Sequence, residues 1–252
     1  MMGKIILKAE NIKKEFGGIV AVKDCSFEVE EQKITALIGP NGAGKTTMFN
    51  ILTGYSKATD GKIWFRGEEI EKQNPQSIAQ KGLSRTFQQI KIFPKMTILE
   101  NMLVAMESYE EAWHGFLQPK KTKQKEEENK QKARELLKLI KLETKENEYA
   151  GNSSYGQQKL LEIIQACAME PKIVLLDEPT AGVNLTMLNT IKELLLALRS
   201  KGITLLFIEH NMEFVMDIAD RIIVMDYGEE IAMGKPKEIK KNKKVIEAYL
   251  GR

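Results

Sequence analysis

Residues 39–47 have the types and spacing of a loop that binds phosphate groups. They run Gly39-Pro40-Asn41-Gly42-Ala43-Gly44-Lys45-Thr46-Thr47, which fits a glycine, four further residues and then Gly-Lys-Thr. Glycine has no Cβ, so the backbone can curl and bring its N–H groups close to phosphate oxygens. We expect Lys45 to reach the β- and γ-phosphates of a nucleotide, and the Thr46 hydroxyl to bind Mg²⁺.

The residues around this loop favour phosphate binding over a chance match. Residues 34–38 are a short apolar run, which is typical of a buried parallel strand. Residues 46–52 mix polar and apolar side chains, as the first turns of a helix do. The start of that helix adds free N–H groups and the positive end of the helix dipole. Strand, glycine-rich turn and helix is the order that the motif requires.

Two acidic residues at the end of another apolar run form the next part of the predicted site. Residues 172–177 end in Asp177, and Glu178 follows at once. Ligands of α/β proteins bind at the carboxyl ends of the parallel strands. We expect Asp177 to hold Mg²⁺ through water, and Glu178 to orient the attacking water or accept its proton. Acids that only cap a helix would look the same, but the phosphate loop favours catalysis.

His210 follows a further apolar run, residues 203–208, where the ends of parallel strands are expected to converge. A neutral imidazole can donate one hydrogen bond to the γ-phosphate and accept another from water or backbone. An isolated histidine would more simply be a surface residue, and its position favours a role here. The second histidine, His114, lies in a helical region and receives no role.

Gln88 and Phe16 are weaker candidates, because an ordinary structural role fits each of them equally well. Gln88 ends a predicted strand, residues 84–88, and would contact Mg²⁺ or the water and report the state of the nucleotide to the region that follows. Phe16 would stack on an adenine ring. A polar strand end and a local packing aromatic are the respective alternatives, and both stay open.

The elements needed to position these residues are predicted from periodicity. Residues 20–30 alternate apolar and polar, as a half-buried antiparallel strand does. Asp60-Gly61 is typical of a hairpin turn between two short strands. Apolar strands that alternate with helices predict a parallel α/β sheet: strands 34–38, 172–177, 203–208 and 221–226, with helices 186–200 and 212–219.

Residues 97–165 form a separate helical region that is rich in Lys, Glu, Leu and Met. Thr97 is the expected N-cap of its first helix, with Glu100 three residues later. A further helix is predicted over 159–169. Oppositely charged side chains spaced four residues apart predict ion pairs on a solvated helix face: Glu126 with Lys130, and Glu128 with Lys132.

Length and composition limit the classes of function. The 252 residues suit one large domain, or a domain with a subdomain, and 42% hydrophobic residues allow a sizeable core. A net charge of +3 is too small to indicate nucleic acid as the main partner. The two cysteines lack metal-type spacing, and free thiols in a cytoplasmic protein are expected. We find neither a signal-peptide pattern nor an apolar run near the roughly 20 residues that span a bilayer, so we expect membrane contact through partners.

In order and spacing, these motifs resemble the ATP-binding cassette ATPases of ABC transporters over almost the whole chain. Residues 39–47 match the Walker A motif and residues 172–178 the Walker B motif. Gln88 matches the Q-loop, His210 the switch histidine and Phe16 the aromatic contact of adenine. The resemblance implies an α/β fold: a P-loop NTPase (RecA-like) core with an antiparallel β subdomain and an inserted helical subdomain.

The same resemblance divides the chain into three segments. Residues 1–88 would be the first part of the nucleotide-binding core, with the antiparallel β subdomain and Walker A. Residues 89–165 would be the helical signature subdomain. Residues 166–252 would complete the core with Walker B, the switch histidine and a C-terminal tail.

Residues 153–157 stand where the family has its signature, Leu-Ser-Gly-Gly-Gln. Ser153 replaces the leucine and Tyr155 replaces the first glycine. The loop still offers a hydroxyl and N–H groups before a helix, which suits a γ-phosphate. The resemblance implies that three residues of the signature bind the ATP held by a second cassette: Ser154, Gly156 and Gln157.

The resemblance also implies an ATPase that uses ATP and Mg²⁺ and works with partners. Two cassettes would sandwich two ATP molecules head to tail, and the helical region would pass their motion through Gln88 to transmembrane permease subunits. The implied location is cytoplasmic, peripheral on the inner face of the cell membrane and bound to the membrane only through partners. No direct contact with nucleic acid is expected.

Finer features are similar to the ATPases of branched-chain amino-acid importers. They are the form of the signature, the loop Ala181-Gly182-Val183-Asn184, whose last residue is usually Asp in the family, and the ending 248–251. Relatives that serve urea or amide uptake or lipopolysaccharide export share several of these features. A soluble ABC-type switch without a transport role and a small-molecule kinase are the alternatives from other classes. Whether the cassette pairs with itself or with a sister subunit stays open.

Overall fold

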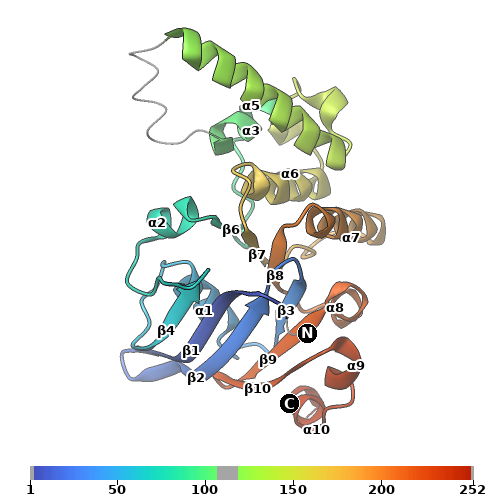
Figure 1. Ribbon diagram of the computed structural model, residues 1–252. Helices are drawn as coiled ribbons and strands as arrows, with labels where there is room; N and C mark the ends of the chain where they lie inside the picture. The colour runs from blue at the N-terminus through green and yellow to red at the C-terminus, as the bar shows by residue number, and fades with distance from the viewer. Residues whose placement is uncertain (1–2, 107–118, 251–252) are drawn as a thin grey trace.

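The computed structural model describes residues 3–106 and 119–250. His114, which received no role above, lies outside them. Within these ranges ten strands form one sheet, and helices cover both of its faces (Figure 1). No helix within them has both the length and the apolar character needed to cross a bilayer.

The strands are numbered along the chain. They are β1 (Ile5–Phe16), β2 (Ile19–Glu30), β3 (Ile34–Ile38), β4 (Asp60–Phe65), β5 (Glu68–Glu69), β6 (Leu83–Arg85), β7 (Ile173–Asp177), β8 (Thr204–Ile208), β9 (Arg221–Asp226) and β10 (Glu229–Gly234). Their order across the sheet is β5-β4-β1-β2-β10-β9-β3-β8-β7-β6.

The helices connect these strands and form a separate group between β6 and β7. They are α1 (Lys45–Leu52), α2 (Pro75–Gln80), α3 (Ile98–Met106), α5 (Pro119–Leu139), α6 (Tyr155–Cys167), α7 (Leu185–Ser200), α8 (Met212–Ile218), α9 (Pro236–Ile239) and α10 (Lys243–Leu250), with the 3-10 turns η1 (Glu143–Lys145) and η2 (Ala150–Asn152). α3, α5 and α6 pack on one another at the top of Figure 1.

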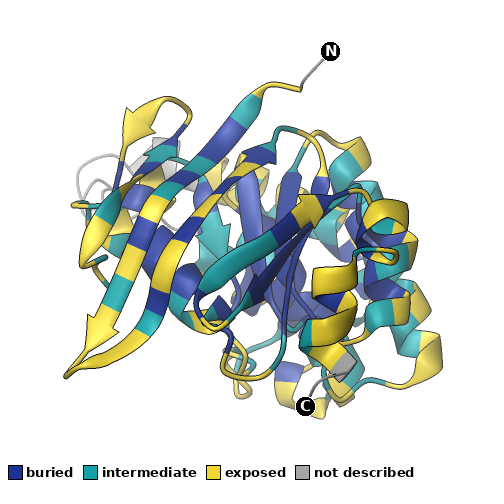
Figure 2. Ribbon diagram, turned by 90° about the horizontal axis from the view of Figure 1, so that it is seen from below, coloured by how far each residue is buried: buried dark blue, intermediate teal, exposed yellow. Residues whose placement is uncertain are grey.

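The middle of the sheet is parallel and fully buried. β3 pairs with β8 and β9, and β8 pairs with β7, in each case in parallel. Every residue of β3, β7 and β8 is buried, and the dark blue interior strands of Figure 2 show this layer. Strands that are covered on both faces read as uninterrupted apolar runs. The predicted α/β core is confirmed.

The two faces of the parallel strands belong to different hydrophobic clusters. In β3, Ile34, Ala36 and Ile38 pack in the cluster that includes residues of α6, α7 and α8. Leu37 packs in the cluster that includes residues of α1, β1 and β2. The alternation of side chains along a strand therefore anchors helices on both faces. The parallel pairing of the strands places the carboxyl ends of β3, β7 and β8 at one edge of this layer.

The N-terminal part of the sheet is antiparallel. β1 pairs with β2 on one side and with β4 on the other, both antiparallel. β2 has the alternating burial that its sequence predicted, with these residues buried: Val22, Cys25, Phe27 and Val29. One parallel bridge, between Glu229 and Asp24, joins β10 to β2 and makes the sheet continuous.

The hairpin turn predicted at Asp60-Gly61 is wrong. Both residues belong to β4, which pairs with β1, and the turn to β5 falls at Arg66 and Gly67. Gly61 has φ +100, and a Cβ there would lie 2.5 Å from the Asn11 carbonyl oxygen. Glycine is therefore required at position 61 because β4 and β1 come too close there for a side chain. Close approach of two strands selects glycine just as a turn does, so the Asp-Gly pair alone does not identify a turn.

The predictions for the helical region are confirmed in part. The Thr97 N–H donates to the Glu100 carboxylate at 2.7 Å, and the Glu100 N–H donates to the Thr97 hydroxyl at 3.1 Å, as a capping box requires. Glu126 and Lys130 form the expected ion pair at 2.7 Å. Lys132 instead pairs at 2.8 Å with Glu170, which lies beyond the end of α6, because a neighbouring segment offers a competing carboxylate.

Candidate active site

The glycine-rich loop joins β3 to α1, and two of its glycines are required by close packing. A Cβ on Gly39 would lie 2.1 Å from the Met225 carbonyl oxygen, and one on Gly44 would lie 2.5 Å from the Ala21 carbonyl oxygen. Gly39, Gly42 and Gly44 all have positive φ, at 154°, 81° and 96°. The loop can follow this path only because these positions lack a side chain.

Lys45 begins α1 and turns back into the loop. Its side chain is buried, with 6% exposure, and Nζ donates to the carbonyl oxygens of Gly39 at 2.7 Å and Pro40 at 2.8 Å. In the described residues no side chain caps the N-terminus of α1, where Gly44 stands as N-cap. Thr46 is exposed in the first turn and Thr47 is half-buried. An ammonium group, open N–H groups and a hydroxyl thus lie together, which suits a phosphate chain.

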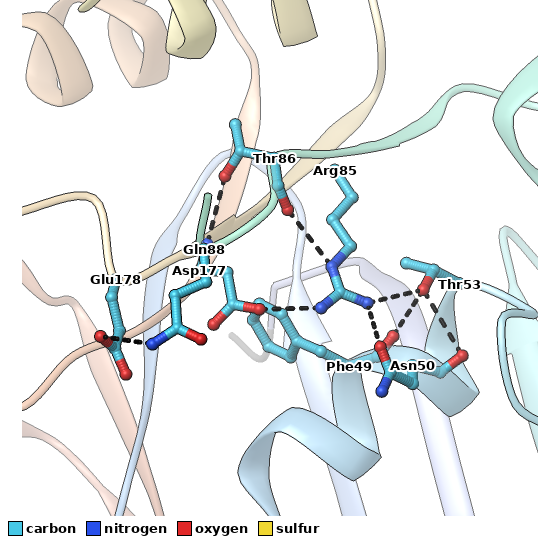
Figure 3. Close-up of polar contacts among 8 residues, drawn as sticks. All are labelled: Phe49, Asn50, Thr53, Arg85, Thr86, Gln88, Asp177 and Glu178. Atoms are coloured by element: carbon cyan, nitrogen blue, oxygen red, sulfur yellow. Dashed lines mark hydrogen bonds and ion pairs between the residues drawn. The ribbon is translucent and has the colours of Figure 1, made fainter. Parts of the chain in front are cut away.

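Glu178 follows β7, and two other loops supply polar partners for its carboxylate. Gln88 donates from Nε2 to Oε2 at 3.4 Å, and His210 Nε2 lies 3.1 Å from Oε1. The structure therefore brings together three residues that the sequence placed in the site (Figure 3 shows Gln88 and Glu178). Both His210 and Glu178 are partly open to solvent. A carboxylate held in this way can orient a water molecule and accept a proton from it.

Asp177 is the last residue of β7 and is almost fully buried. Its carboxylate is paired with Arg85, whose Nη2 lies 2.8 Å from Oδ2. The Asp177 N–H donates to the Thr86 hydroxyl at 3.2 Å. Sequence reasoning missed this contact, although an arginine inside a short strand is a signal, because a buried guanidinium needs an acidic partner. The predicted strand 84–88 is shorter, since pairing ends at Arg85.

Glu209 is a second residue that sequence reasoning missed. Its carboxylate is buried and accepts hydrogen bonds from the Thr180 N–H at 2.8 Å and the Thr180 hydroxyl at 2.6 Å. The N–H groups of His210 and Asn211 donate to its other oxygen. Glu209 therefore fixes the loop that carries His210 against the loop after Glu178. An acid directly after an apolar strand was the available signal.

An open cleft of about 790 Å³ lies beside these loops. Its lining includes Glu178, His210 and the start of α7 at Leu185. Asn184, where the family usually has an aspartate, accepts a hydrogen bond from the Met187 N–H at 2.9 Å and caps α7. The carboxylate and the imidazole thus border a space that solvent and a further molecule can enter.

The signature residues lie at the start of α6. The helix begins at Tyr155 and not near Lys159, because Ser154 and Gln157 form a capping box. The Gln157 N–H donates to the Ser154 hydroxyl at 3.4 Å, and the Ser154 N–H donates to Gln157 Oε1 at 3.0 Å. A Cβ on Gly156 would lie 2.6 Å from the Met187 methyl group, so this turn packs closely on α7.

The structure does not bring the signature residues or Phe16 to the other site residues. α6 lies in the upper part of Figure 1, away from α1, and no hydrogen bond joins Ser154 or Gln157 to the glycine-rich loop in the described ranges. Phe16 ends β1 with 49% exposure, and Lys14 Nζ lies 4.6 Å from the centre of its ring. Its predicted contact with adenine stays a prediction.

Comparisons with known proteins agree with this arrangement. A family model described as "ABC transporter" matches residues 22–181, and one described as "Branched-chain amino acid ATP-binding cassette transporter" matches residues 229–252. The chain is 41% identical, over 99% of both chains, to the high-affinity branched-chain amino acid transport ATP-binding protein BraF of Pseudomonas aeruginosa.

Solved structures share the whole fold. A nucleotide-free ATP-binding cassette from an ABC transporter superposes with a TM-score of 0.85 at 38% identity, with 98% of this chain and 100% of that chain covered. A dimeric cassette in a post-hydrolysis state, bound to ADP and Pi, superposes with a TM-score of 0.74 at 26% identity, with 92% and 99% covered.

Proposed function

Since the chain belongs to the ATP-binding cassette family of ABC transporters, we propose that it is the ATP-hydrolysing subunit of an importer for branched-chain amino acids. The observation that carries ATP hydrolysis is the position of Glu178, between Gln88 and His210 at the end of β7. The match of the C-terminal residues 229–252 to a branched-chain transporter model supports the solute class.

The roles of the site residues follow from their chemistry. Lys45 would exchange the carbonyl oxygens of Gly39 and Pro40 for phosphate oxygens, which bind an ammonium more strongly because they are charged. The N–H groups of residues 41–47 would surround the phosphates at the positive end of α1. Glu178 would orient the attacking water and accept its proton, and His210 would hold Glu178 and the γ-phosphate in register.

The residues present fit Mg²⁺. This ion prefers oxygen ligands, retains water molecules, and binds one or two carboxylates together with substrate phosphates. The Thr46 hydroxyl and the Asp177 carboxylate are oxygen ligands of this kind, and Gln88 offers an amide oxygen. Within the described ranges no cluster of three His, Cys, Asp or Glu side chains forms a cage of its own. Bound Mg²⁺ would neutralise phosphate charge as the terminal phosphate leaves.

We further propose that two cassettes act together. Ser154 and Gly156 lie at the start of α6, a helix that Figure 1 shows away from α1, so they would complete the site of a second cassette in a head-to-tail ATP sandwich. Gln157 would support this contact through the capping box that shapes the turn. A related cassette in the post-hydrolysis state is a dimer, which supports the pairing. Phe16 would contact adenine from the exposed end of β1.

The same proposal assigns a part of the cassette to each segment of the chain. Residues 1–88 and 166–252 would form the nucleotide-binding core, and residues 89–165 would be the subdomain that carries the signature. The grouping of α3, α5 and α6 supports that boundary. Transmembrane permease subunits would hold the protein on the cytoplasmic face of the membrane, which its membership of the ABC transporter family supports.

The test is to isolate the transporter from solubilised membranes with the tagged chain and to reconstitute it in lipid vesicles. We expect leucine or isoleucine, supplied with the cognate solute-binding protein, to stimulate ATP hydrolysis and to accumulate inside. The same preparation made with Glu178→Gln is the control, and it should bind solute but accumulate none. Stimulation by urea or short amides, without any by leucine, would reject the solute class. An isolated complex without ATPase activity would reject the function itself.

A further inference from the structure

Arg85 is the last residue of β6, an outer strand of the sheet, but its guanidinium group is buried at the centre of a network that the family motifs do not include. Its side chain has 6% exposure, and that of Asp177 has 4%. The guanidinium lies between two aromatic rings, 5.6 Å from the centre of Phe49 and 5.2 Å from that of Phe87. Cation–π contacts of this kind stabilise a charge that has lost its water.

Each nitrogen of the guanidinium group has its own partner (Figure 3). Nη2 donates to Asp177 Oδ2 at 2.8 Å, and Nε donates to the Thr86 carbonyl oxygen at 3.2 Å. Nη1 donates to Asn50 Oδ1 at 2.7 Å and to the Thr53 hydroxyl at 3.2 Å. The planar fork of arginine can serve three directions at once, which the single ammonium of a lysine cannot do.

These partners come from the three segments that build the nucleotide site. Asn50 and Thr53 lie at the end of α1, the helix that begins with Lys45. Asp177 ends the Walker B strand, and Thr86 opens the loop that leads to Gln88. Arg85 therefore ties the helix behind the phosphate loop to both segments that carry predicted metal ligands.

The contact uses one side of the Asp177 carboxylate. Arg85 engages Oδ2 and leaves Oδ1 outside this contact. The Thr86 hydroxyl accepts from the Asp177 N–H at 3.2 Å and holds the backbone of the same residue. With its backbone and one oxygen fixed, the carboxylate has a defined orientation, and the second oxygen is left for another ligand.

We propose that Arg85 is the positioning residue for Asp177: it neutralises one carboxylate oxygen and orients the other toward Mg²⁺, and so sets the metal affinity of the nucleotide-bound protein. This inference rests on the proposed function. Residues that orient a metal ligand without touching the metal typically change metal affinity by about 10- to 100-fold when they are replaced.

The experiment measures Mn²⁺, as a spectroscopic substitute for Mg²⁺, bound to the full-length protein with ATP, by electron paramagnetic resonance. We expect Arg85→Gln to weaken Mn²⁺ binding at least about tenfold. Arg85→Lys keeps the positive charge but loses the planar fork of nitrogens, so its Mn²⁺ affinity should lie between those of the parent and of Arg85→Gln. Binding of a fluorescent ATP analogue in EDTA should change less than twofold, because the phosphate loop is untouched.

Two further variants separate positioning from mere stability. Thr53→Val removes one contact of Arg85 on α1 and leaves the Asp177 pair in place, so it should lower the melting temperature without changing Mn²⁺ affinity. Arg199→Gln breaks an ion pair with Asp220, near the opposite end of the parallel strands, and serves as the matched control. In a double-mutant cycle, Arg85→Gln should add little to Asp177→Asn, since both act on the same ligand.

The outcomes are distinct. Mn²⁺ affinity that is unchanged in folded Arg85→Gln would overturn the proposal, and if that variant does not fold, unchanged affinity in Arg85→Lys would do the same. Additive effects of Arg85→Gln and Asp177→Asn on Mn²⁺ affinity would also contradict the proposal, because they would show that the two residues act independently. A parent protein that binds no ATP would instead reject the proposed function, which keeps the two failures apart.

Discussion

The His210 imidazole reaches across from the loop after β8 to the Glu178 carboxylate, with 3.1 Å between Nε2 and Oε1. Glu178 itself has a φ of 50°, in the left-handed region that residues with a side chain seldom occupy. Its N–H is held by the Ile208 carbonyl oxygen at 3.1 Å. Unfavourable backbone geometry that the surrounding structure maintains is characteristic of functional sites. The end of β8 thus has two effects on Glu178: the loop after it carries His210, and the Ile208 carbonyl oxygen holds the Glu178 backbone in its unfavourable conformation.

Replacing Glu178 with glutamine should stop turnover and leave ATP bound. The amide keeps the size of the side chain and loses the ability to accept a proton, so ATPase activity should fall about 10²- to 10⁴-fold. The parent is expected to be a weak ATPase as a monomer. With ATP, Glu178→Gln should elute from size-exclusion chromatography as a dimer. Glu193→Gln, on the exposed side of α7, is the control. A monomeric Glu178→Gln with normal hydrolysis would contradict the role of Glu178.

Lys45→Ala should abolish tight nucleotide binding. The ammonium is the only side-chain cation that the described structure places inside the glycine-rich loop, where it donates to two carbonyl oxygens. Charge-assisted contacts to phosphate contribute about 1.5–3 kcal/mol each, so affinity should fall at least about tenfold by calorimetry. Lys4→Ala removes an exposed ion pair with Glu31 and should leave ATP affinity unchanged. Equal affinity of Lys45→Ala and the parent would reject the nucleotide site.

Replacing Gly39 with alanine should destabilise the protein more than replacing Gly42, although both glycines lie in the same loop. Gly39→Ala places a Cβ against backbone at 2.1 Å, whereas Gly42→Ala meets nothing within 4 Å. Both positions have positive φ, which costs about 1 kcal/mol for alanine. Gly39→Ala should therefore lower the free energy of unfolding by at least about 2 kcal/mol more than Gly42→Ala. Urea unfolding without nucleotide measures the difference. Equal midpoints for the two variants would contradict the prediction, because they would mean that the Met225 backbone moves to make room for the Cβ.

The buried thiols of Cys25 and Cys167 should make the free energy of unfolding decrease as the pH rises above about 9. Burial raises the pKa of Cys25 and of Cys167 from 9.0 to about 12 in each case. Below pH 9 both thiols are protonated in the folded and unfolded states, so stability is full there. Between about pH 9 and 12 the unfolded chain loses these protons first, and unfolding is favoured.

Urea midpoints at pH 8 and pH 10 measure this effect, and a Cys25→Ala, Cys167→Ala variant shows how much of the change belongs to the thiols. At pH 8 about one folded thiol in 10,000 is ionised, so thiol reagents should label the native protein far more slowly than the unfolded chain. Rapid labelling of the native protein at pH 8 would contradict the burial of both cysteines.

The sequence predicted the parallel core well because burial on both faces imposes an uninterrupted apolar run. β3 and β7 were placed within a residue of their ends for that reason. The Thr97 capping box was equally predictable, since its partners are three residues apart. Local patterns of this kind do not depend on how the chain folds back on itself.

Which particular side chains pair across long distances in the sequence could not be predicted. Arg85 and Asp177 are separated by 92 positions, and only the parallel pairing of β6 with β7 brings them together. The same limit explains Lys132, whose partner Glu170 arrives from another segment. For the site, the strand ends grouped Gln88, Glu178 and His210 correctly in space, while their chemical roles remain predictions.

The sheet ends in strands that offer little backbone to another chain. β5, at one side, is two residues long, Glu68 and Glu69, both of them exposed and acidic, and β6, at the other, is three residues long. Short, charged outer strands resist the edge-to-edge joining that leads to aggregation. Under the proposed function the chain assembles with membrane subunits, and outer strands of this kind would let it accumulate before assembly without polymerising through its sheet.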